Sequence, residues 1–133
     1  DEIADSYPEQ QARFHAALGV GHITQHRIDD PTEVEIFLRL SARGRLGAGE
    51  RSAIAVALNR GCALAIDDSR AIRRAIEEAG IAGNPLTVLR TQDVIVHLIR
   101  AKLLEIEAAD AIKENWHLNH RFTIRVGAFA ELL

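Results

Sequence analysis

The chain has 133 residues, of which 47% are hydrophobic and 26% charged, and its formal net charge is −3. This length and composition fit one ordinary globular domain and exclude a disordered or fibrous chain. The single cysteine excludes an internal disulfide, and no apolar run reaches the ~18 residues of a membrane span. We therefore expect one domain over residues 1–133 in the reducing cytoplasm.

Helical and short apolar segments alternate in the first half of the chain. Residues 8–18 suit a helix, and the alternation over residues 22–28 predicts a short strand. A second helix begins at residues 30–33, where Asp caps, Pro takes the first turn and Glu completes a capping box. The face that we expect this helix to bury consists of Val34, Phe37, Leu38 and Ala42.

The second half continues the alternation after a glycine-rich loop. A helix begins at Glu50 and ends at Gly61. The uninterrupted apolar run of residues 62–66 predicts a strand buried on both faces, as in a parallel sheet covered by helices. The elements that follow are a helix over 69–79, a strand over 86–89, and helices over 91–102 and 107–119. This order indicates βαβ units, so we predict an α/β fold, a three-layer α/β/α sandwich with a mostly parallel central sheet.

Three acidic residues surround the predicted buried strand. Asp67 and Asp68 follow its end, and Glu50 lies in the first turn of the helix before it. Because that helix runs antiparallel to the strand, its start and the strand's end share the edge where such sheets bind ligands. Converging carboxylates select Mg²⁺ or Mn²⁺, which can activate water and stabilise a pentavalent phosphate. The alternative is that Asp68 caps the next helix and Glu50 complements the dipole of its own helix.

Several stretches carry a family resemblance. Residues 46–58 read LGAGERSAIAVAL, residues 63–68 read ALAIDD, and residues 90–104 read RTQDVIVHLIRAKLL. Together with residues 73–75 and residues 1–3, these stretches resemble the PIN domains, in particular the bacterial and archaeal PIN proteins related to VapC-type toxins. The resemblance covers most of the chain.

The resemblance implies a metal-dependent endoribonuclease with a PIN-like fold. Its acids would match Glu2, Glu50 and Asp68, with Asp67 as a substitute for Asp68. These residues would bind Mg²⁺ or Mn²⁺, Glu50 and Asp68 would be catalytic, and metal-bound water would attack the RNA phosphodiester. The resemblance also implies a homodimer and a cognate antitoxin protein, which makes this chain the toxin component of a toxin–antitoxin pair.

Three arginines near Glu50 bear on the RNA substrate. Arg43, Arg45 and Arg51 could contact RNA phosphates at the rim of the acidic site, or they could form a solvated face. Arginine suits the first role because its planar guanidinium binds phosphate oxygens in pairs.

One acid of the family pattern has no match in this sequence, because it belongs to an opening strand. The chain begins with Asp1 and contains no Met, so we expect an upstream segment that supplies this strand and its Asp. The alternative function is a non-catalytic protein-interaction domain with an incomplete acidic site. A response-regulator receiver domain, which also has an acidic pair, fits less well because its pair lies on the first strand.

Overall fold

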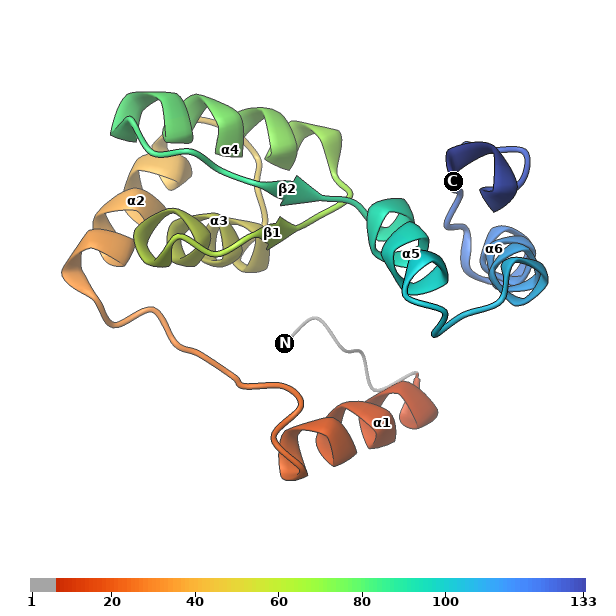
Figure 1. Cartoon of the computed structure of the whole chain (residues 1–133). Helices are drawn as coiled ribbons and strands as arrows, with labels where there is room; N and C mark the ends of the chain where they lie inside the picture. Colours follow the sequence, from red (N-terminus) through yellow and green to blue (C-terminus); the bar gives the residue numbers. More distant parts are fainter. Residues whose placement is uncertain (1–6) are drawn as a thin grey trace.

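The computed structural model describes residues 7–133, and helices dominate this part of the chain (Figure 1). In chain order its elements are α1 (Pro8–Gly19), α2 (Pro31–Ala42), α3 (Ala48–Arg60), β1 (Leu64–Ala65), α4 (Ser69–Ala82), β2 (Val88–Leu89), α5 (Thr91–Arg100), α6 (Ile106–His120) and the 3₁₀-helix η1 (Phe129–Leu132). The two strands pair in parallel, with Leu64 opposite Val88 and Ala65 opposite Leu89.

The predicted three-layer, PIN-like α/β/α sandwich is wrong for this structure. Within residues 7–133 the sheet has two strands of two residues each, which is too small to form a central layer. The predicted strand over residues 22–28 is absent from this part of the chain. Its apolar content is too low to hold it in a sheet, since Ile23 is 42% exposed and only Ile28 packs against a core.

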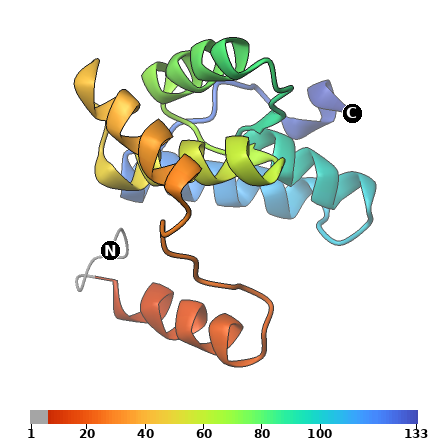
Figure 2. The same ribbon diagram turned by 90° about the vertical axis from the view of Figure 1, so that its left-hand side faces the viewer.

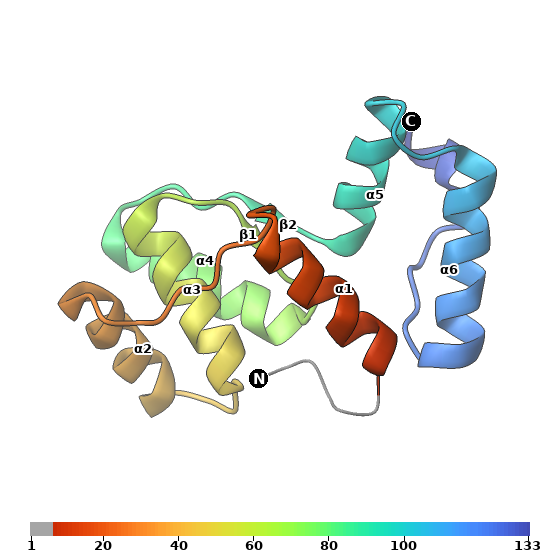
Figure 3. The same ribbon diagram turned by 90° about the horizontal axis from the view of Figure 1, so that it is seen from below.

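One hydrophobic core joins α2, α3, β1 and α4, which gather on one side of the molecule (Figure 3). Leu40 of α2 and Ile54 of α3 are fully buried at its centre, and Ala71 and Ala75 bring α4 close. The start of α2 agrees with the sequence: Asp30 accepts a 2.8 Å hydrogen bond from the N–H of Thr32, directly before Pro31 at the first helical position.

The buried face of α2 differs from the predicted one. Ile36 and Leu40 face the core, whereas Val34 and Leu38 are 39% and 60% exposed. The helix is apolar on two adjacent faces, and α3 covers only one of them. Val34, Phe37 and Leu38 line an open cavity instead.

Glu33 also differs from its predicted role in a capping box. Its carboxylate is fully buried and accepts hydrogen bonds from Arg60 Nε at 2.6 Å, Arg60 Nη2 at 3.1 Å and Asn59 Nδ2 at 3.2 Å. The hydrogen bond from Arg60 is the largest cause that lowers the pKa of Glu33, and burial opposes it. The pair therefore ties the start of α2 to the end of α3.

A second core joins α5, α6 and the C-terminal segment. Phe129 is fully buried in it, together with Ile95, Ala109 and Ile124. The segment is anchored by hydrogen bonds from the Phe129 N–H to Asp110 Oδ1 at 3.1 Å and from Lys113 Nζ to the Val126 carbonyl at 3.2 Å. These contacts hold the C-terminal segment against α6.

Helix α1 lies apart from the first core, at the end of an extended segment (Figure 2). None of its residues is buried. At its start, the rings of Tyr7 and His120 approach to 6.2 Å. Among the described helices, none combines the length and apolar character that crossing a bilayer requires.

Candidate functional site

The acidic pair Asp67–Asp68 stands where the sequence places it, directly after β1. Both strands run toward the end of the sheet at which α4 and α5 begin (Figure 1). Asp68 precedes α4, and Thr91 opens α5 immediately after β2. The carboxyl ends of the two strands therefore bring an acidic pair and two helix N-termini to the same edge, which is where ligands bind in open parallel sheets.

Asp68 is the N-cap of α4. Its Oδ1 accepts hydrogen bonds from the N–H groups of Arg70 at 2.8 Å and Ala71 at 2.9 Å. The bond from Ala71 is the largest cause that lowers the pKa of Asp68, burial opposes it, and the bond from Arg70 adds to it. Among residues 7–133, the only contact of Oδ2 is a long one, 3.5 Å from Arg70 Nη2. Asp68 is thus held as a carboxylate with one oxygen available.

Asp67 ties β1 to the start of α5. Its Oδ1 accepts a 3.0 Å hydrogen bond from the Thr91 N–H, and its Oδ2 accepts one from the Thr91 hydroxyl. Asp67 also lines a cavity of about 300 Å³ together with Arg90 and Arg125. The sequence suggested Asp67 only as a substitute for Asp68, and it contained no sign of the partner Thr91, which lies 24 residues away.

Glu50 lies in the first turn of α3 and bonds back to the residue before the helix, a contact that neither interpretation of the sequence included. Its Oε2 accepts a 2.8 Å hydrogen bond from the N–H of Gly47. Glu2, the remaining predicted ligand, lies outside the described residues. Over residues 7–133, no three acidic, histidine or cysteine side chains come together as a metal site. Each of the predicted carboxylates in this range also stabilises a local backbone structure.

The three predicted RNA-binding arginines separate into two environments. Arg43 and Arg45 line a cavity of about 290 Å³ at the loop between α2 and α3. Arg51 does not line it: its guanidinium lies 4.6 Å from the centroid of the Phe37 ring and donates to the Gly47 carbonyl and the Ser41 hydroxyl.

Three further arginines complete the cavity, and the sequence analysis missed them. Arg70, Arg73 and Arg74 of α4 line it opposite Arg43 and Arg45. Their spacing was the available signal, since residues three and four positions apart share one face of a helix. What the sequence could not show is that this face meets the loop after α2. Arg70 also contacts Asp68, so the arginine cavity adjoins the acidic pair.

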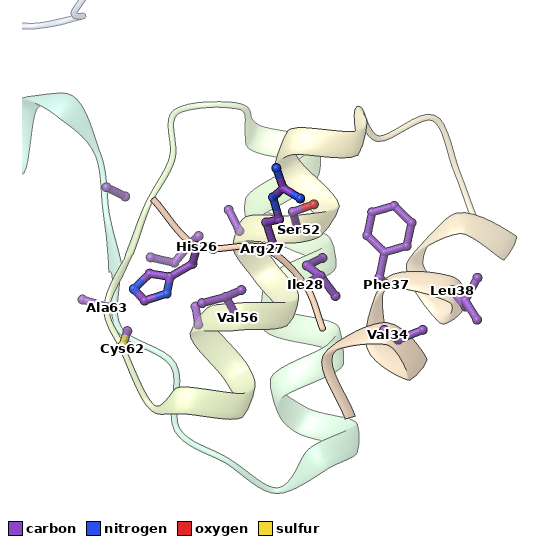
Figure 4. Close-up of a pocket in the computed structure, with 14 residues that line it drawn as sticks. His26, Arg27, Ile28, Val34, Phe37, Leu38, Ser52, Val56, Cys62 and Ala63 are labelled. Atoms are coloured by element: carbon purple, nitrogen blue, oxygen red, sulfur yellow. The ribbon is translucent and has the colours of Figure 1, made fainter. Parts of the chain in front are cut away.

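A larger cavity of about 780 Å³ is lined by α2, α3, residues 26–28 and residues 62–65 (Figure 4). Apolar side chains dominate its lining, among them Val34, Phe37 and Val56. Its polar side chains are His26, Arg27 and Ser52, and its lining contains no carboxylate in the described part of the chain. This cavity is therefore separate from the acidic edge and offers no acid for catalysis.

Comparison with known proteins adds no assignment: no family model, no curated protein and no solved structure matches this chain. The functional argument therefore depends on the residues and their geometry.

Proposed function

We propose that this chain is a metal-dependent endoribonuclease that holds Mg²⁺ or Mn²⁺ through Asp68, at the acidic pair Asp67–Asp68. The observation that carries the proposal is the acidic pair at the carboxyl ends of β1 and β2, adjoining a cavity lined by five arginines. Carboxylates that bind a hard cation, next to guanidinium groups that bind phosphate oxygens, are the chemistry that phosphodiester hydrolysis needs.

The donor set fits Mg²⁺ in one specific way. Mg²⁺ keeps several waters and is commonly held by one or two carboxylates together with substrate phosphate oxygens. The available Oδ2 of Asp68 meets this need, although the described residues supply no cluster of three acids. When bound, the ion supplies an activated water and neutralises charge on the phosphate. Asp68 would hold the ion, and Arg70 beside it would orient a phosphate oxygen.

The test compares RNA cleavage by the wild-type chain and by Asp68→Asn, with Mn²⁺ and with EDTA. Asn caps a helix about as well as Asp, so the variant keeps its fold while losing the charge that binds the cation. We expect Mn²⁺-dependent cleavage of single-stranded RNA by the wild type, its loss in EDTA, and a reduction of at least about 100-fold in the variant.

Glu107→Gln is the matched control, because Glu107 is an exposed carboxylate on α6, away from the acidic edge. It should cleave as the wild type does. Cleavage that persists in EDTA, or that Asp68→Asn leaves unchanged, would contradict the proposal.

One observation favours a second candidate, a non-catalytic protein-interaction domain. Asp67, Asp68 and Glu50 all accept hydrogen bonds from backbone N–H groups. These bonds explain the presence of each carboxylate without a catalytic role. If the second candidate is right, Mn²⁺ will shift the melting temperature of the wild type no more than it shifts that of Asp68→Asn. If the first is right, the cation stabilises the wild type by mass action.

The proposal extends to the biological setting that the sequence resemblance implies. There the chain is the cytoplasmic toxin of a toxin–antitoxin pair, forms a homodimer and is inhibited by an antitoxin protein. This part rests on the resemblance alone. Purification from the native cell should yield a complex with a small protein encoded by a neighbouring gene, and recovery of the chain without one would contradict the toxin role.

A further inference from the structure

We propose that the arginine cavity, formed by residues 43–46 and by Arg70, Arg73 and Arg74, binds a phosphate group of the RNA backbone. The inference rests on the proposed function, and it assigns three residues of α4 to substrate binding. The volume of about 290 Å³ lies at the lower end of the range for ligand sites, which suits a phosphate group better than a whole cofactor.

The charge balance of the cavity calls for an anion. Five arginines line it, and within the described part of the chain two of them have acidic partners within 4.0 Å. Arg70 contacts Asp68 at 3.5 Å, and Arg74 contacts Glu77 at 2.6 Å and Glu78 at 3.9 Å. Across the described residues, no carboxylate forms an ion pair with the other three arginines, which are Arg43, Arg45 and Arg73. Like charges gathered from two separate segments repel one another, and a bound anion removes this repulsion.

The position of the arginines on α4 also favours an anion. Arg70 and Arg73 lie in the first two turns, close to the positive end of the helix dipole. Cations are disfavoured there, whereas anions are stabilised. Because the Asp68 carboxylate already caps this N-terminus, a phosphate in the cavity would interact mainly with the arginines.

Arg74 forms ion pairs with Glu77 and Glu78, but these contacts do not satisfy all of its hydrogen-bond donors. Its Nε and Nη2 are buried and have no hydrogen-bond partner among the described residues. These two nitrogens form the edge of the guanidinium that pairs with two oxygens of a phosphate or carboxylate. Buried donors without an acceptor are costly and rare in native proteins, and an unobserved ion is one established explanation.

The test follows the Arg74 Nε–Hε resonance by NMR while inorganic pyrophosphate is added in the presence of EDTA. We expect a saturable shift, and we expect single-stranded oligouridylate to compete for the same site. Arg73→Gln should weaken binding of both ligands about tenfold, because it removes one charged hydrogen bond. It should also reduce the slope of log K against log salt for the RNA by about 0.7.

Arg27→Gln is the matched control. Arg27 is exposed, lines the apolar cavity, and has no ion pair in the part of the chain that the structure describes, so the variant loses the same charge elsewhere. Both variants replace an exposed side chain, and unchanged far-UV circular dichroism checks that they fold. Binding of either ligand should be affected far less by Arg27→Gln than by Arg73→Gln.

Three results would overturn the inference. They are the absence of a saturable shift, equal weakening by the two variants, and pyrophosphate binding that RNA does not displace, which would indicate a site for free phosphate. The measurement is made in EDTA and involves no cleavage, so its outcome is independent of the nuclease test. Phosphate and RNA binding without cleavage would refute the proposed reaction but leave this site standing.

Discussion

Replacing Leu40 and Leu38 by Ala in separate variants tests which face of α2 the protein buries. Leu40 is fully buried, and Leu38 on the same helix is 60% exposed. Each substitution removes three carbon atoms, and about 0.8 kcal/mol per buried CH₂ gives about 2.4 kcal/mol for complete burial. Leu40→Ala adds a cavity term, so we expect the free energy of unfolding to fall by about 3–4 kcal/mol. Leu38→Ala has no more than about two-fifths of the transfer loss, which is about 1 kcal/mol.

The assay is urea unfolding followed by far-UV circular dichroism, with the slope of unfolding free energy against urea compared between variants. Both substitutions exchange the same residues in one helix, so their effects on helix propensity cancel. Equal destabilisation by the two variants, or a larger effect of Leu38→Ala, would refute the reasoning. It would show that the face chosen from the sequence, with Val34 and Phe37, is buried in solution.

Three further predictions follow from the helix ends. The pKa of Asp68 is lowered from 3.8, so the ionised side chain stabilises the fold above pH 3.8. In acid unfolding, the free energy of unfolding of the wild type should decrease as the pH falls through the lowered pKa. Asp68→Asn should not show this decrease. Gly83→Ala should destabilise by about 1 kcal/mol in thermal unfolding because Gly83 has φ +68°, whereas Gly80→Ala, within the helix, should stabilise by about 0.5–1 kcal/mol. Thr91→Val removes the hydroxyl bonded to Asp67, and hydrogen exchange at the start of α5 should become faster.

Local features of the chain could be predicted because they depend on neighbouring residues. The start of α2 follows from Asp30 and Pro31. The end of α4 does not: the sequence analysis ended this helix at residue 79, but it continues through Gly80 to Ala82 and ends at Gly83, which adopts a left-handed conformation at little cost. The position of Asp68 directly before a helix is also a local matter, and the cap that the sequence allowed is present.

The predicted sheet failed for a non-local reason. An alternating or apolar run forms a strand only if another strand pairs with it, and the sequence does not specify the partner. Residues 62–66 and 86–89 pair over two residues each, and residues 22–28 do not join them. Glu33 shows the same limit, because a capping-box pattern cannot reveal Arg60, which lies 27 residues away.

By itself, the sequence determined the approximate positions of the helices, the place of Asp67–Asp68 after a short strand and the proximity of Arg43 and Arg45 to the start of α3. Only the tertiary structure decided which face of α2 is covered and which arginines share a cavity. The reason is that capping and periodicity act over a few residues, whereas burial and charge clustering depend on segments that meet only when the chain folds. The arginine cavity is an example, because it forms where residues 43–46 pack next to α4.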